Sequence, residues 1–296
     1  MSDPIIRRLT FDDLDEALSL STTAGWNQQR DDWSMLLQLA PAGAFAALSD
    51  ARIVGTAIGI DYGGFAWIAM MLVDAAYRGR GVGRRLLEAA IDAVPSHLPI
   101  RLDATPLGRP LYQRHGFEDE AMLSRYVADG STHRVASASE ALDGSRDVRP
   151  LTASDLDIVI DRDSETFGGT RGAVLDWAFR RAAQYAHVVQ SRDGLTHYCL
   201  GRPGRIFDQI GPVVAGHDDI AQALVSAALA AAGDRPIVVD AFDSRTTFTA
   251  GLRSRGFRVQ RPLVRMCRPA GSNAGATGIL HRGPLAEFAI LGPEFA

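Results

Sequence analysis

The chain has 296 residues, a length typical of two domains, and 46% of them are hydrophobic. All 31 basic residues are arginine, and 35 acidic residues give a formal net charge of -4. This balance argues against the strongly basic surface of nucleic-acid-binding proteins and against a polybasic membrane anchor.

Cysteine usage and hydrophobicity narrow the class of protein further. Cys199 and Cys267 lie far apart, and neither has a His or Cys beside it at the spacing of metal ligands, so we expect no disulfide framework, no metal site and a cytoplasmic location. The N-terminus has no apolar stretch typical of a secretory signal, and no apolar run reaches about 18 residues. An arginine-only chain rich in alanine and glycine is typical of a GC-rich bacterium.

An internal repeat predicts a duplicated domain. Each copy begins with a predicted strand, a threonine N-cap and a helix with acidic residues in its first turn. Three pairs of similar segments occur in the same order, at offsets of 142, 137 and 140 residues: 7–15 with 149–157, 99–104 with 236–241, and 116–117 with 256–257. The repeat predicts domains at residues 1–128 and 148–269, a connector at 129–147 and a tail at 270–296 that packs back onto a domain.

Within the first copy, strands and helices are expected to alternate as a mixed α/β unit. Antiparallel strands precede an amphipathic helix, and a further strand and a short helix follow it. The predicted strands are residues 44–48, 52–60, 65–73 and 100–104, and the predicted helices are 83–94 and 108–114.

The segment between the third strand and the amphipathic helix is typical of an anion site. Gly79, Gly81 and Gly83 expose backbone N–H groups at the positive end of the helix, and Arg78 and Arg84 flank them. A pyrophosphate suits such a loop. A P-loop is excluded because it requires lysine, whereas a dinucleotide fold with other glycine spacing and a ligand-free turn remain alternatives.

Two motifs resemble those of the GNAT N-acetyltransferase superfamily. Its Arg/Gln-x-x-Gly-x-Gly/Ala signature is matched at residues 78–83, and Tyr112 precedes Gly116 and Phe117 as the family's helix tyrosine does. The duplication is similar to tandem GNAT proteins, and segments 24–26, 210–215 and 265–266 resemble the bacterial YitH-like branch. The resemblance implies two tandem α/β (α+β) domains, each a mixed, mainly antiparallel twisted sheet flanked by helices.

The resemblance also implies an activity. Acetyl-CoA would be the cosubstrate, and a primary amine of a small molecule would attack it directly in a ternary complex. The Val73 N–H would polarise the thioester carbonyl, and Tyr112 would protonate the leaving thiolate. The residues implied for acetyl-CoA binding are Met71, Leu72, Val73, Arg78, Gly79, Arg80, Gly81, Val82, Gly83, Arg84, Thr105 and Tyr112.

One position departs from the family pattern. Trp67 stands where many members carry the glutamate that serves as general base, and Asp61 is the nearest acid, so no base is assigned. The second copy lacks the arginine–glycine loop and has Leu252 in place of the tyrosine. We therefore expect one active site, in the first copy.

The acceptor side is less marked in the sequence. Trp26, Asn27 and Trp33 in the first copy, and Phe167 and Arg171 in the second, are its candidate residues. No nucleic-acid or membrane partner is expected, and the chain would be a monomer or homodimer. Two alternatives remain: a CoA-binding regulatory protein without catalysis, and a protein or peptide N-acetyltransferase.

Overall fold

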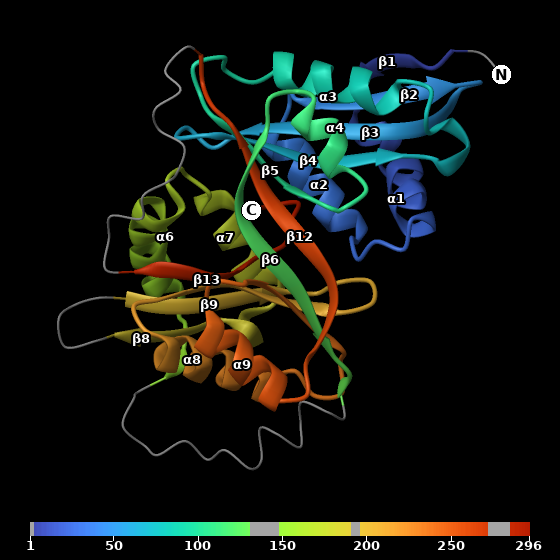
Figure 1. Ribbon diagram of the computed structural model, residues 1–296. Helices are drawn as coiled ribbons and strands as arrows, with labels where there is room; N and C mark the ends of the chain where they lie inside the picture. Colours follow the sequence, from blue (N-terminus) through green and yellow to red (C-terminus); the bar gives the residue numbers. More distant parts are fainter. Residues whose placement is uncertain (1–2, 131–147, 191–195, 272–284) are drawn as a thin grey trace. The chain divides into compact units, whose positions relative to one another are not determined.

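The computed structural model describes residues 3–130, 148–190, 196–271 and 285–296 (Figure 1). Most of the predicted connector and the first part of the predicted tail lie outside these ranges. The described residues form two compact units: the first contains residues 3–118, 266–271 and 295, and the second contains 119–130, 148–190, 196–265, 285–294 and 296. Across these ranges, no helix has the length and apolarity needed to span a bilayer.

The first unit is a mixed sheet with helices packed against it (Figure 1). Strands β1 to β4 pair antiparallel in succession, and β5 pairs in parallel with β4. This arrangement confirms the strands and helices predicted for the first copy. Its elements are β1 (Ile5–Arg8), η1 (Phe11–Asp13), α1 (Leu14–Thr23), α2 (Arg30–Leu39), β2 (Ala44–Ser49), β3 (Arg52–Asp61), β4 (Ala66–Val73), η2 (Ala75–Tyr77), α3 (Val82–Asp92), β5 (Ile100–Ala104) and α4 (Arg109–Gln113).

Helix α3 buries its predicted apolar face against the sheet. Val82, Leu86 and Leu87 are buried, and the helix contacts β2, β3 and β4. The approach to β3 is close because a Cβ at Gly59 would lie 2.6 Å from the Ala90 carbonyl oxygen, closer than real contacts allow. This packing positions the first turn of α3 next to the end of β4.

The second unit repeats the plan with a longer sheet. Its strand order is β12-β6-β11-β13-β10-β9-β8-β7, and β12 crosses the division between the units at Met266. The elements are β6 (Glu118–Ala128), β7 (Arg149–Pro150), α6 (Ala153–Phe167), α7 (Gly172–Arg181), η3 (Ala183–Tyr185), β8 (His187–Gln190), β9 (Thr196–Arg202), β10 (Asp208–Ala215), α8 (Asp218–Ala231), β11 (Ile237–Phe242), α9 (Thr246–Ser254), β12 (Arg258–Arg268) and β13 (Ala286–Ile290).

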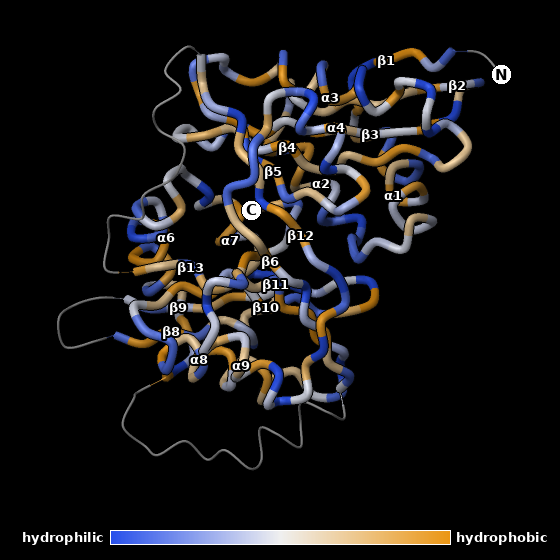
Figure 2. The backbone as a smooth tube through the Cα atoms, in the orientation of Figure 1, coloured by the Kyte–Doolittle hydropathy of each residue, from blue (hydrophilic) through white to orange (hydrophobic). Residues whose placement is uncertain are grey.

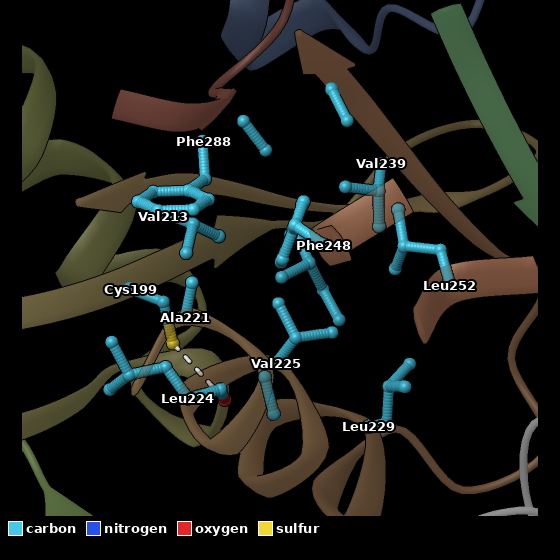
Figure 3. Packing of buried hydrophobic residues seen from close by; sticks show 14 of the residues in the cluster. Cys199, Val213, Ala221, Leu224, Val225, Leu229, Val239, Phe248, Leu252 and Phe288 are labelled. Carbon is cyan, nitrogen blue, oxygen red and sulfur yellow. Dashed lines mark hydrogen bonds between the residues drawn. The ribbon is translucent and has the colours of Figure 1, made fainter. Parts of the chain in front are cut away.

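The core of the second unit lies between its sheet and helices α8 and α9. Leu224 and Val225 of α8 pack with Val213 of β10, Val239 of β11 and Phe248 of α9 (Figure 3). Hydrophobic and hydrophilic residues both occur along the helices (Figure 2), as expected of helices with one buried face.

The repeated N-terminal motif forms the same hydrogen bonds in both units. Arg7 donates two to Asp13, at 2.7 and 2.8 Å, and the Thr10 N–H donates to the same carboxylate. In the second unit, Arg149 binds Asp155 at 2.6 and 2.7 Å, and the Thr152 N–H donates to Asp155. The arginine and these bonds lower the pKa of both carboxyls, that of Asp13 to about 2. Thr10 is the N-cap of η1, which leads into α1, and Thr152 is the N-cap of α6, so the predicted threonine N-caps are confirmed.

We expect Asp13→Asn and Asp155→Asn each to lower the free energy of unfolding at pH 7 by about 1 kcal/mol, the usual size for a helix cap. The folded pKa lies below the unfolded one, so this stabilisation is present above about pH 4 and is lost as pH falls towards 2. Urea unfolding at pH 7 and pH 3 measures the difference. Asp12→Asn, at an exposed position of the same first turn, is the control. An equal deficit at both pH values would contradict the assignment.

Candidate active site

The glycine loop joins β4 to α3 in the conformation that its residues predict. Gly79 and Gly81 have φ of +74° and +78°, in the left-handed region that favours glycine. Gly81 is the N-cap of α3, so the loop brings its backbone to the positive end of an 11-residue helix. Arg78 Nε donates to the Val73 carbonyl oxygen at 3.1 Å and ties the loop to the end of β4.

A pocket of about 660 Å³ lies at this loop. One wall comes from the end of β4, the loop and the first turn of α3, and the other comes from α4 and the residues just before and after it. Its lining residues are Val73, Tyr77, Arg78, Gly79, Gly81, Val82, Gly83, Arg84, Leu107, Gly108, Leu111, Arg114 and His115. The volume and the concave shape are those of a small-molecule site.

The charge of the pocket favours an anion. Arg78, Arg84 and Arg114 line it, and none of the described residues that line it is acidic. Glu88 contacts two of the lining residues: it accepts from Arg84 at 3.1 Å and lies 3.5 Å from His115 Nε2. Both Arg78 and Arg84 are exposed, so their guanidinium groups are within reach of a bound phosphate.

Strand β4 separates from β5 just before the pocket. In the described part of the chain, the two strands pair only at Ala66 and Trp67 of β4. Further along β4, Met70 has a φ of +52° and its carbonyl oxygen accepts from Thr56 Oγ1 at 2.8 Å. The β3–β4 register shifts at this point, as in a β-bulge. We call the opening between β4 and β5 beyond Trp67 the first notch; residues 71–73 lie along it.

Tyr112 is buried beside the pocket rather than on its lining. Its side chain is 7% exposed and packs edge-on against Phe117, with ring centroids 6.0 Å apart. A Cβ at Gly108 would lie 3.5 Å from Tyr112 Oη and 3.6 Å from Thr105 Oγ1, so both groups lie close to Gly108. Burial raises the pKa of the Tyr112 phenol above its usual range, which keeps the phenol protonated at neutral pH.

No carboxylate stands in for the family's usual base on β4. Trp67 is fully buried and packs edge-on against Phe65 at 6.3 Å. Asp61 is exposed at the hairpin turn, where its Oδ1 accepts from the Gly63 N–H at 2.7 Å. Across the described residues, no three His, Cys, Asp or Glu side chains group as metal ligands would.

Both halves of the chain match models of one family. Residues 41–119 and 159–278 each match an acetyltransferase (GNAT) domain, together more than half of the chain. The chain belongs to the GNAT acetyltransferase family. It is therefore an acyltransferase with two tandem GNAT domains, and the pocket described above lies in the first of them.

Relatives of this GNAT protein cover most of its length. It is 28% identical over 203 residues to the uncharacterised N-acetyltransferase YitH of Bacillus subtilis. The alignment covers 66% of this chain and 67% of YitH. The chain belongs to the YitH-like branch. It is 27% identical over 206 residues to the holothin acyltransferase of Pseudoalteromonas sp., covering 69% and 67% of the two chains.

Solved structures share the fold over 90% or more of the chain. A crystal structure of an acetyltransferase candidate from Pyrococcus horikoshii aligns with a TM-score of 0.73 at 23% identity, over 99% of this chain and 96% of that one. The GCN5-related N-acetyltransferase from Sphaerobacter thermophilus aligns with a TM-score of 0.63 at 17% identity, over 90% and 97%. These likenesses bear on the fold alone.

The structure places the predicted cofactor residues of this GNAT protein in two sets. Val73 and the loop residues line the pocket, apart from Arg80, whose guanidinium lies over the Tyr77 ring at 5.4 Å. Met71 and Leu72 lie along the first notch, and Thr105 and Tyr112 lie close to Gly108. The lining residues that the sequence did not single out are Tyr77, Leu107, Gly108, Leu111, Arg114 and His115. Except for Tyr77, they belong to α4 or to the residues next to it. The sequence feature that pointed to this wall was the short helix predicted before Gly116 and Phe117.

The candidate acceptor residues lie in both GNAT units. Trp26 is half-buried and Asn27 is buried, between α1 and α2. Trp33 is fully buried in α2, and its Nε1 donates to Ser21 Oγ at 3.1 Å. Phe167 and Arg171 are buried in the second unit, where the Arg171 guanidinium lies 4.0 Å from the centroid of the Phe167 ring.

Proposed function

We propose that the first unit transfers the acetyl group of acetyl-CoA to a primary amine of a small molecule. The observation that carries this proposal is the pocket itself. It joins an arginine-flanked helix N-terminus, suited to a pyrophosphate, to a strand edge that is free of β5 beyond Trp67. A pantetheine arm carries amide groups, which a free strand edge can bind as it would bind another strand.

The reaction follows from the groups at this junction. The neutral amine attacks the thioester carbonyl carbon, so that a C–N bond forms and the C–S bond breaks. The nitrogen loses one proton to water and the sulfur takes one as it leaves, and solvent returns a proton to the acid. We propose that the Val73 N–H polarises the carbonyl oxygen and that Tyr112 supplies the proton. Tyr112 suits this role because its phenol lies close to Gly108, which lines the pocket. Both substrates are bound together, which makes the attack effectively unimolecular.

For the acceptor, we propose a small molecule held beside Trp26 and Asn27. Trp26 is half-buried and retains surface for a ligand, whereas Trp33 already donates its N–H to Ser21. Arg171 is engaged by acidic side chains of its own unit. We also propose that residues 1–128 form the catalytic domain and that the enzyme is cytoplasmic, which is consistent with the sequence having two cysteines, Cys199 and Cys267, far apart in the chain.

The direct test is release of free CoA thiol from acetyl-CoA across a panel of amines, polyamines, amino acids and peptides. The panel includes holothin because one relative is named for it. We expect a small amine to raise the rate above buffer. If peptides alone did so, the acceptor class would be wrong. If no acceptor did so while acetyl-CoA still raised thermal stability, a binding role without transfer would replace the proposal.

Tyr112→Phe is expected to lower kcat on the order of tenfold or more, with the Kd for acetyl-CoA nearly unchanged. Burial keeps the phenol protonated, so the deficit should be the same from pH 6 to pH 9. Steady-state kinetics and calorimetry measure the two quantities. Tyr126→Phe is the matched control because it removes the same hydroxyl from a buried tyrosine of β6. Unchanged kcat in Tyr112→Phe would remove Tyr112 from the mechanism.

A further inference from the structure

The second unit contains a counterpart of the first notch. Among the residues that the structure describes, β10 pairs in parallel with β11 only at Asp208 and Gln209, just as β4 pairs with β5 only at Ala66 and Trp67. Gln209 follows Trp67 by 142 residues, the offset of the repeated N-terminal motif. The register of β10 against β9 also shifts just beyond this point, as that of β4 against β3 does. We call the opening between β10 and β11 beyond Gln209 the second notch.

Strand β13 fills the second notch. It pairs antiparallel with residues 213–215 of β10 on one side and with Asp240 and Ala241 of β11 on the other. Residues 213–215 follow residues 71–73 by the same 142 positions. The strand edge proposed to bind pantetheine in the first unit is therefore occupied, in the second, by a segment of the chain itself.

Buried side chains hold β13 in place. Glu287 is 6% exposed and accepts from Arg171 Nη2 at 2.8 Å, and Arg171 is itself bound to Asp163 through two bonds of 2.9 Å. The Phe288 ring lies 5.4 Å from that of Phe248 in an edge-on contact, within the main core cluster (Figure 3). An ion pair and an aromatic residue on successive positions anchor β13 on both faces of the sheet.

The segment of the second unit that matches the glycine loop of the first also differs from it. Helix α8 begins three residues after β10 ends, with His217 as its N-cap and no glycine loop before it. Asp218 and Asp219 occupy its first turn, where carboxylates repel an anionic ligand. Leu252, at the position that matches Tyr112, is 1% exposed in the core.

We propose that the second notch is a peptide-strand site whose resident ligand is β13, and that the second unit for this reason binds no CoA. A main-chain strand takes the hydrogen bonds that a pantetheine arm would take, as in β-strand addition. The proposal rests on the proposed function in one respect: the first notch is taken as the acetyl-CoA site. The pairing of β13 with β10 and β11 does not depend on the proposed function.

Hydrogen exchange of the full chain, with and without saturating acetyl-CoA, tests both notches at once. We expect acetyl-CoA to slow exchange in residues 68–73 and to leave residues 210–215 and 285–291 unchanged, already slow in its absence. Calorimetry should give one acetyl-CoA per chain. Slowed exchange in residues 210–215, or two molecules per chain, would overturn the inference. No binding at all would overturn the proposed function instead, while fast exchange in residues 285–291 would still overturn this inference.

Glu287→Gln tests what holds the strand. Removing one charge of a buried pair should speed exchange in residues 285–291 and 213–215 by at least about a hundredfold. The Kd of the first unit for acetyl-CoA should stay the same. Glu165→Gln, at an exposed position of α6, is the matched control. Exchange as slow as in the wild type would show that the ion pair does not hold β13, and the wild-type exchange would still decide whether the notch is filled.

Discussion

Gly83→Leu is expected to weaken acetyl-CoA binding by at least about a hundredfold, or about 3 kcal/mol, without destabilising the fold. Gly83 lies in the first turn of α3 and lines the pocket. A Cβ there would lie 3.6 Å from Leu111 Cδ2 and 3.6 Å from Val73 Cγ2, one on each wall. A leucine side chain would extend between these walls into the space proposed for the ligand.

Stability should not fall, because Gly83 has ordinary helical backbone and leucine is a better helix former than glycine by about 0.5–1 kcal/mol. Calorimetry measures the binding, and thermal unfolding without ligand measures the fold. Gly83→Ala is the matched control: its methyl group makes only ordinary contacts, so binding should be kept. If Gly83→Leu bound acetyl-CoA as tightly as Gly83→Ala, the phosphate site would lie elsewhere.

Local features of the site could be predicted from the sequence because they depend on a few neighbouring residues. Glycines at 79 and 81 are needed where φ is positive, and the apolar face of the next helix sets its packing on the sheet. The repeated Arg-x-x-Thr-x-x-Asp pattern likewise predicted a helix N-terminus, and the structure shows its hydrogen bonds twice. The conformation of such segments is determined mainly by neighbouring residues, so it can be read from a short stretch of sequence.

The other wall of the pocket could not be predicted in the same way. Leu107, Leu111 and His115 face the glycine loop only because β5 brings α4 next to α3, and that placement depends on contacts distant in sequence. The strands with which β13 pairs were even harder to predict from the sequence. Its apolar residues indicated packing against a domain, but pairing with β10 joins segments about 70 residues apart. Alternating hydrophobicity predicts a strand without naming its partners.

The same limit applies to Arg171, which the sequence placed among the acceptor candidates. The structure shows its guanidinium fully buried, with Nε and Nη2 donating to Asp163, Nη2 to Glu287 and Nη1 to the Ala296 carbonyl oxygen. Tyr198 Oη also donates to Asp163. An arginine whose donors are distributed among groups of its own unit stabilises those groups. Its loss removes the bidentate partner of the buried Asp163 and leaves Glu287 with the more distant Arg265, at 3.9 Å.

Arg171→Leu is therefore expected to lower the free energy of unfolding by about 3–5 kcal/mol, which makes it one of the most destabilising single changes in the second unit. Urea unfolding followed by circular dichroism measures the loss. Arg180→Leu, at an exposed arginine of α7, the helix that Arg171 precedes as N-cap, is the control and should change stability by less than about 0.5 kcal/mol. A role in the acceptor pocket predicts the opposite pattern, a raised KM for the amine with stability kept. That result would return Arg171 to the substrate site and leave β13 without its main electrostatic anchor.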